Sequence, residues 1–194
     1  MDNFNYYVVT GCPGTGKTTV GNKIVSALGT ELLEPELVRE ELNIKEYSNK
    51  DTPQIVDILH GRIRGLIESG RPAVYCRAYV SMETRAESYK LIRVISSELG
   101  LAIRSVLIKC TCTEAVAKQR IRDRRILNDV HSHPKDPNVW DRIKGYEVPL
   151  CDDEINHEPD FSFILYNSET NQVEEICVRT THRKAVGILK GIIT

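Results

Sequence analysis

Residues 11–18 read Gly11-Cys12-Pro13-Gly14-Thr15-Gly16-Lys17-Thr18. This stretch follows an apolar run at residues 6–9 and precedes a helix-like pattern from Thr18 to Leu28. Glycines at this spacing let backbone N–H groups close around phosphate oxygens, and the N-terminus of the helix adds a partial positive charge. Because a strand, a loop and a helix follow in this order, the stretch predicts a phosphate-binding loop rather than a chance glycine-rich turn.

The side chains at the end of this loop predict how a nucleoside triphosphate is bound. We expect Lys17 to reach the β- and γ-phosphates and the hydroxyl of Thr18 to hold Mg²⁺. Lys17 is therefore also a candidate catalytic residue. The predicted nucleotide-binding residues are Gly11, Cys12, Pro13, Gly14, Thr15, Gly16, Lys17, Thr18 and Thr19, together with Arg120 from farther along the chain.

The composition of the chain restricts its partners. The 194 residues include 26 Lys and Arg against 27 Asp and Glu, a formal net charge of −1. The molecule as a whole therefore has no long-range attraction to nucleic acid or anionic lipid, and a polyanion must be met by a local patch. A chain of this length predicts one α/β domain over residues 1–194.

The N-terminal residues do not look like an export signal. Met1 to Asn5 contain no basic segment followed by an apolar stretch, and no apolar run in the chain is long enough to span a bilayer. We therefore expect a cytoplasmic protein without a membrane partner.

Strand-like runs alternate with helical patterns along the chain, which is typical of a parallel sheet covered by helices on both faces. Residues 127–137 lose all periodicity and are predicted to form a loop. The expected strands are 5–10, 31–33, 72–76, 101–109 and 161–166, and the expected helices are 18–28, 35–42, 52–69, 82–99, 115–126, 140–146 and a tail from about 172 to the end.

A carboxylate and an arginine follow the second predicted strand, where ligands bind in open parallel sheets. Glu36 and Arg39 are three residues apart on one helical face. Phosphoryl transfer needs a carboxylate that accepts the proton of a hydroxyl and cations that balance the developing charge. We interpret Glu36 as a general base that also contacts the acceptor, and Arg39 as an acceptor-binding cation. The alternative is an ordinary first helical turn, in which the helix dipole favours an acidic side chain.

A second cluster of cations lies on the helix predicted before the loop. Arg120 and Arg124 are four residues apart and share a face, whereas Arg122 points away from it. Planar, permanently charged guanidinium groups suit phosphate. We interpret Arg120 and Arg124 as catalytic cations that contact the polyphosphate; the alternative is a solvated basic face.

These motifs together resemble small P-loop kinases of the polynucleotide-kinase, zeta-toxin and predicted-kinase (AAA-type 33) group. The resemblance covers residues 6–125. It implies a three-layer, nucleoside-kinase-like P-loop fold with a five-stranded parallel sheet in the order 2-3-1-4-5. It also implies an ATP-dependent phosphotransferase that uses Mg²⁺, a lid at about 127–137, and an adenine pocket near Arg120 and Asn167. The matching segments are Gly11 to Thr18, Glu36 to Arg39, Val74 to Arg77 with Ser81 to Arg85, and Arg120 to Arg124.

Two positions depart from the pattern that the resemblance implies. Glu36 stands where such kinases have an aspartate, so the carboxylate is one methylene farther from the backbone. Cys76 stands where they usually have an aspartate near Mg²⁺, and a thiol cannot supply a hard oxygen to that ion. Arg77, which follows it, and Arg85 are interpreted as acceptor-binding cations.

The acceptor is not specified by these residues. We expect ATP to phosphorylate a hydroxyl group of a small molecule or a nucleotide. A polynucleotide 5′-hydroxyl end is the alternative, but it is less favoured because aromatic residues, which stack on bases, make up 6% of the chain. Cys76 also leaves open a nucleotide-binding regulator with little transfer activity. A motor ATPase and a GTPase switch fit poorly, because their acidic and N-K-x-D motifs are missing.

Overall fold

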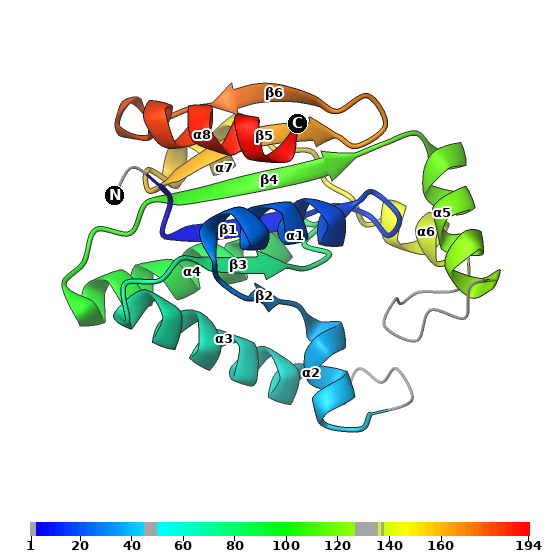
Figure 1. The fold of residues 1–194 in the computed structure, drawn as a ribbon, viewed down its shortest axis with the longest axis horizontal. Coiled ribbons are helices and arrows are strands. Elements are labelled where there is room, and N and C mark those ends of the chain that lie inside the picture. The colour runs from blue at the N-terminus through cyan, green and yellow to red at the C-terminus, as the bar shows by residue number, and fades with distance from the viewer. Residues whose placement is uncertain (1–2, 45–49, 127–135, 137) are drawn as a thin grey trace.

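The structure, a computed structural model, describes residues 3–44, 50–126, 136 and 138–194. A single sheet in the order β2-β3-β1-β4-β5-β6 forms its centre (Figure 1). All neighbouring strands are parallel except the last pair, in which β6 runs antiparallel to β5. The strands are β1 Tyr6–Thr10, β2 Leu32–Leu33, β3 Ala73–Cys76, β4 Ser105–Thr111, β5 Phe161–Asn167 and β6 Gln172–Cys177.

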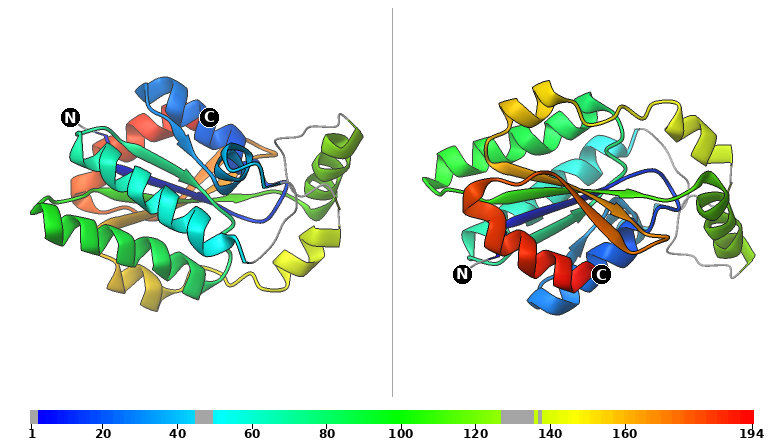
Figure 2. Two further views of the ribbon diagram at one scale, coloured as in Figure 1. Left: turned by 90° about the horizontal axis from the view of Figure 1, so that it is seen from below. Right: turned by 90° about the horizontal axis from the view of Figure 1, so that it is seen from above.

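Helices cover both faces of this sheet, as Figure 2 shows. The buried side chains of α3 and α4 pack on one face, and those of α1 and α8 pack on the other. None of the described helices is both long enough and apolar enough to cross a membrane. The helices are α1 Lys17–Leu28, α2 Pro35–Glu41, α3 Thr52–Glu68, α4 Met82–Leu99, α5 Glu114–Ile126, α6 Asn138–Lys144, α7 Asp152–His157, the 3₁₀ helix η1 Thr180–His182 and α8 Arg183–Ile193.

Strand β1 shows why the central strands are mostly apolar. Tyr6 and Val8 belong to the core beneath α3 and α4, whereas Tyr7 and Val9 belong to the core beneath α1 and α8. Successive strand residues point to opposite faces, so a sheet covered on both sides needs an apolar residue at every position. The sequence predictions of a three-layer α/β fold and of the strand order 2-3-1-4-5 are confirmed.

The C-terminal region differs from its prediction. The segment from Gln172 was expected to be helical, but residues 172–177 form β6 and the final helix begins only at Arg183. The turn before β6 explains the difference: the Asn167 side chain accepts hydrogen bonds from the backbone N–H groups of Glu169 and Thr170, and Asn171 has a φ of 56°. This turn chemistry reverses the chain, and pairing with β5 then overrides local helical tendency. Helix α7 was not predicted.

The carboxyl ends of the strands bring the predicted motifs to one edge of the sheet. Val9 of β1 pairs with Cys76 of β3, and Thr10 pairs with Lys109 of β4. Helices α5 and α6 lie beyond this edge (Figure 1). The predicted lid at 127–137 lies outside the described residues apart from Asp136.

Candidate active site

The phosphate-binding loop connects β1 to the first turn of α1. Gly11 has a φ of 140° and Gly14 a φ of 79°, both in the left-handed region. A Cβ on Gly11 would lie 2.4 Å from the backbone oxygen of Cys110, and a Cβ on Gly14 would lie 2.5 Å from that of Ala117. Glycine is therefore required at both positions, because the loop backbone lies directly against β4 and α5.

Lys17 lies inside this loop. Its Nζ donates a hydrogen bond to the backbone oxygen of Cys12 at 3.0 Å. Burial lowers the pKa of the Lys17 ammonium, which the nearby Glu36 carboxylate partly offsets. A desolvated cation is stabilised by a bound anion, so this environment favours a phosphate group next to Lys17.

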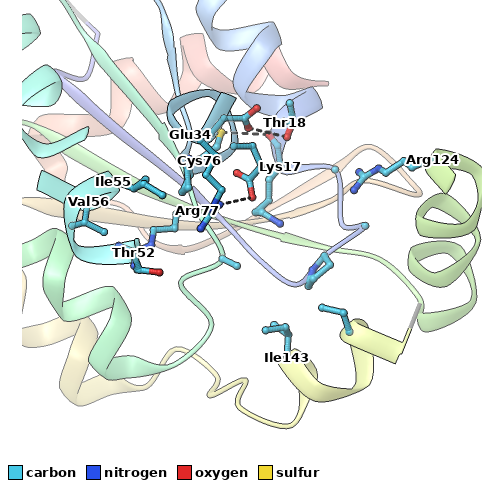
Figure 3. A pocket seen from close by; sticks show the side chains of 18 of the residues that line it. Lys17, Thr18, Glu34, Thr52, Ile55, Val56, Cys76, Arg77, Arg124 and Ile143 are labelled. Atoms are coloured by element: carbon cyan, nitrogen blue, oxygen red, sulfur yellow. Dashed lines mark hydrogen bonds and ion pairs between the residues drawn. The ribbon is translucent and has the colours of Figure 1, made fainter. Parts of the chain in front are cut away.

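A cavity of about 390 Å³ opens beside the loop. Its lining comes from the loop, α2, α3 and α6, and Figure 3 shows the side chains around it. The lining residues are Pro13, Gly14, Gly16, Lys17, Thr18, Glu34, Pro35, Glu36, Arg39, Thr52, Ile55, Val56, Cys76, Arg77, Ala78, Arg124, Val139, Arg142 and Ile143.

Glu36 and Arg39 line the cavity together, as their spacing predicted. The Nη1 of Arg39 lies 3.7 Å from a carboxylate oxygen of Glu36, and the Arg39 side chain is 10% exposed. Pro35 at the start of α2 presets the backbone of the first helical turn that carries them. The fold thus brings a carboxylate and a guanidinium to the same cavity as Lys17.

A second carboxylate in the cavity was not predicted. The Oγ1 of Thr18 donates a hydrogen bond to the Oε2 of Glu34 at 3.1 Å (Figure 3). Burial and the neighbouring Glu36 carboxylate raise the pKa of Glu34, and Thr18 and Lys17 act in the opposite direction. Position 34 carries no known motif; its one signal in the sequence is an acidic residue directly after a short apolar strand.

Cys76 ends β3 and is buried against α1. Its thiol lies 3.7 Å from the backbone oxygen of Lys17, to which it donates, and a Cβ on Gly21 would lie 2.5 Å from the sulfur. Burial raises the pKa of the Cys76 thiol well above its ordinary value, and Glu34 adds to this effect. The group is therefore a neutral thiol packed against the helix.

Arg77 lines the cavity but is held by neighbours. Its Nη1 donates to the carboxylate of Glu87 at 3.0 Å and to the hydroxyl of Tyr79 at 3.1 Å. The guanidinium also lies over the Tyr79 ring, 4.7 Å from the centroid. These contacts fix the position of Arg77, and 18% of its side chain remains exposed.

Arg120 and Arg124, the two candidate arginines of α5, have different surroundings. Arg124 lines the cavity, whereas Arg120 does not. Arg120 donates to the backbone oxygen of Gly14 and to both the hydroxyl and the backbone oxygen of Ser168. It therefore joins the phosphate-binding loop to the turn after β5, where the resemblance placed the adenine. Thr19 is exposed on α1, outside the cavity.

Arg85 is not part of the cavity, which corrects its interpretation as an acceptor-binding residue. Its side chain is 0% exposed, and Nε and Nη2 each lie 2.6 Å from an oxygen of Glu154. Its other hydrogen bonds go to the backbone oxygens of Val80, Val148 and Pro149. Since a guanidinium has five donors in all, these contacts leave none for an acceptor.

An ion pair that is largely buried contacts the loop at Cys12. The Glu147 carboxylate lies 2.9 Å from the Nζ of Lys109 and also contacts Lys144, and these ammonium groups lower the pKa of Glu147 although burial opposes them. The thiol of Cys12 lies 3.8 Å from Glu147. Burial and this carboxylate raise the pKa of the Cys12 thiol to about 11.

Sequence reasoning also missed the parts of the cavity wall that come from α3 and α6. Ile55 and Val56 come from α3, and Arg142 and Ile143 come from α6. The sequence contains no motif at these positions. Their proximity to Lys17 follows only from the packing of α3 and α6 at the carboxyl edge of the sheet.

A mostly parallel sheet with a phosphate-binding loop after its central strand and helices on both faces defines a P-loop protein of the α/β class. The chain belongs to the AAA domain family AAA_33, whose profile matches residues 7–149. Among curated proteins, no sequence matches the chain significantly.

Several solved structures share this fold, two kinases among them. Kti12 of Chaetomium thermophilum, solved with ADP-AlF3, is 15% identical with a TM-score of 0.60, and the match covers 97% of this chain and 99% of Kti12. The APS kinase of Mycobacterium tuberculosis, solved with AMPPNP and APS, is 18% identical with a TM-score of 0.54 and 96% coverage of both chains. A gluconokinase from Sinorhizobium meliloti 1021 is 18% identical with a TM-score of 0.52, covering 98% of this chain and 95% of its own.

Proposed function

We propose that this protein is a kinase that transfers the γ-phosphate of ATP to a hydroxyl group of a small, anionic acceptor in the presence of Mg²⁺. The observation that carries the proposal is the shared cavity of Lys17, Glu36 and Arg39. A phosphate-binding lysine, a carboxylate able to accept a proton and an arginine beside it are the groups that phosphoryl transfer requires.

The charges around the cavity favour an anionic acceptor. The lining includes the cations Lys17, Arg39, Arg77, Arg124 and Arg142 and the carboxylates Glu34 and Glu36. Lys17 and Arg124 are assigned to the triphosphate, which leaves three arginines on the acceptor side. Ile55, Val56 and Ile143 contribute an apolar wall there, so the acceptor combines a negative group with an apolar part.

In the proposed reaction, the acceptor hydroxyl oxygen attacks the γ-phosphorus. The bond between that phosphorus and the bridging oxygen of the β-phosphate breaks, and ADP leaves. Glu36 accepts the hydroxyl proton, Arg39 and Arg77 hold the acceptor, and Lys17 and Arg124 balance the charge that moves to the phosphate oxygens. Arg120 acts indirectly: its hydrogen bond to the backbone oxygen of Gly14 fixes the phosphate-binding loop in position.

The oxygen donors beside the loop fit a magnesium ion. Thr18 supplies a hydroxyl oxygen at the cavity, as Mg²⁺ prefers, whereas the buried thiol of Cys76 is unsuited to it. When bound with ATP, Mg²⁺ would neutralise charge on the β- and γ-phosphate oxygens.

Incubation with radiolabelled ATP, Mg²⁺ and an acceptor panel tests this proposal. The panel contains hydroxy carboxylates, nucleoside monophosphates, neutral sugars and 5′-hydroxyl oligonucleotides. We expect labelled product from an anionic small molecule, and a loss of about 100-fold or more in kcat for Glu36→Gln. Glu40→Gln, which changes an exposed acid of the same helix outside the cavity, is the matched control.

Other outcomes separate the alternatives. Label on oligonucleotides alone, with binding that weakens steeply in salt, would identify a polynucleotide 5′-hydroxyl kinase. Tight ATP binding with no product from any acceptor would favour a nucleotide-binding regulator. Unchanged turnover in Glu36→Gln would show that Glu36 is not the base.

A further inference from the structure

A magnesium ion in this kind of site needs a carboxylate near the loop hydroxyl. Mg²⁺ is usually held by one or two carboxylates together with substrate phosphates, and it keeps several waters. Position 76, where the resemblance implies an acidic residue, is a buried thiol with a raised pKa. If the protein uses MgATP as proposed above, the acid must come from another element.

Glu34 meets this requirement from the end of β2. Its Oε2 accepts a hydrogen bond from the Oγ1 of Thr18 at 3.1 Å, and both residues line the cavity with Lys17. The backbone of Glu34 is extended, with φ −144° and ψ 149°, and its side chain does not cap α2, the helix that follows. The carboxylate therefore reaches across to α1 rather than satisfying its own helix.

The direction of this hydrogen bond suits a metal-binding hydroxyl. The Thr18 hydroxyl donates a hydrogen bond to Glu34, which leaves the lone pairs of the hydroxyl oxygen available to a cation. Mutation of a group that orients a ligand in this way typically costs about 10- to 100-fold in metal affinity. Glu34 also stands two residues before Glu36, and both carboxylates line the same cavity, where like charges repel. A divalent cation relieves such repulsion between neighbouring carboxylates.

We propose that Glu34 is the acidic residue of the magnesium site, replacing the carboxylate that position 76 lacks. Glu34 and Thr18 hold Mg²⁺ on the nucleotide side of the cavity, while Glu36 serves the acceptor hydroxyl. The two carboxylates of the segment 34–36 thus have separate tasks. This inference rests on the proposed function for the presence of MgATP, but it does not depend on which acceptor is used.

Calorimetric titration of the full chain with ATP, in EDTA and in Mg²⁺, tests the role of Glu34. The native protein should bind ATP more tightly with Mg²⁺ than without it. Glu34→Gln should lose about 10- to 100-fold of that enhancement. In EDTA, the same variant should bind ATP as well as the native protein or better, because a negative charge beside the phosphates has been removed.

Two controls and one spectroscopic measurement complete the test. Glu31→Gln removes an exposed acid, paired with Arg71, three residues earlier and should keep the native Mg²⁺ enhancement. Glu34→Asp should retain part of it. Mn²⁺, whose EPR signal distinguishes free from bound ion, should bind in the presence of a non-hydrolysable ATP analogue and bind at least about tenfold more weakly to Glu34→Gln.

Each contrary outcome has a distinct meaning. Equal Mg²⁺ enhancement in Glu34→Gln and native protein, or an equal loss of ATP affinity in both buffers, would overturn the role of Glu34. A Cys76→Asp variant that gains tenfold or more in Mg²⁺ enhancement would also overturn it, since the native site would then lack its acid. No binding of ATP by the native chain in either buffer would instead overturn the proposed function.

Discussion

Thr18 and Glu34 are joined by a hydrogen bond of 3.1 Å across 16 positions of the chain. This contact ties the first turn of α1, which carries Lys17, to the segment between β2 and α2. Because Glu36 and Arg39 follow on α2, one short stretch positions Glu34, Glu36 and Arg39 in the cavity, and in the proposed function these residues serve both the nucleotide and the acceptor. Movement of α2 relative to α1 would therefore disturb both.

Arg85 and Glu154 should stabilise the fold rather than bind substrate. Arg85→Met leaves the Glu154 carboxylate buried without its cation, although the Tyr89 hydroxyl still donates to it, and we expect a loss of about 3–5 kcal/mol in the free energy of unfolding. The double variant Arg85→Met/Glu154→Leu removes both charges and should recover a large part of this loss. Urea denaturation measures both effects.

The same two variants test the earlier interpretation of Arg85. If the folded double variant binds a confirmed acceptor with native affinity, Arg85 has no role in acceptor binding. A large rise in the acceptor KM with native stability would restore that role.

Arg120 should affect ATP affinity through the loop that it holds. Arg120→Ala removes the donors that join Gly14 to Ser168, and we expect the Kd for ATP to rise about tenfold or more. Arg122→Ala is the matched control, since Arg122 is exposed on the same helix and does not line the cavity. Equal effects of the two variants would mean that Arg120 acts only through net positive charge.

The thiol of Cys12 should react slowly near neutral pH. Its pKa of about 11 means that very little thiolate is present at pH 8, so alkylation by iodoacetamide should be much slower there than at the exposed Cys151. The rate at Cys12 should rise with pH up to about 11. Mass spectrometry of digested protein gives the two rates separately, and comparable rates at pH 8 would contradict the burial of Cys12.

The raised pKa of Cys12 also has a consequence for stability. The folded state keeps the thiol protonated to higher pH than the unfolded chain, in which the pKa is about 9. Its contribution to stability is therefore present below about pH 9 and is lost as pH rises toward 11. Cys12→Ala should remove this part of the pH dependence in urea melts.

The sequence was sufficient to predict the features that depend on local patterning. The glycine spacing of residues 11–18 predicted the phosphate-binding loop. Apolar runs that alternate with helical patterns predicted a parallel sheet covered by helices on both faces. The spacing of Glu36 and Arg39 also predicted their common face, which the cavity confirms. The prediction of a helix at residues 172–177 was wrong. The turn at 167–171 reverses the chain, and the strand pairing with β5 that follows outweighs local helical propensity.

The sequence alone determined the phosphate-binding-loop motif and the class of fold that carries it, because φ angles, helix dipoles and apolar periodicity act over a few residues. Only the tertiary structure decided which charged side chains face the cavity. In the folded chain, Arg85 is buried in an ion pair with Glu154, and Glu34 accepts a hydrogen bond from Thr18. Such contacts join distant segments of the chain. A charged group that becomes buried needs a partner, and which partner lies within reach depends on the packing of those segments, not on the local sequence pattern.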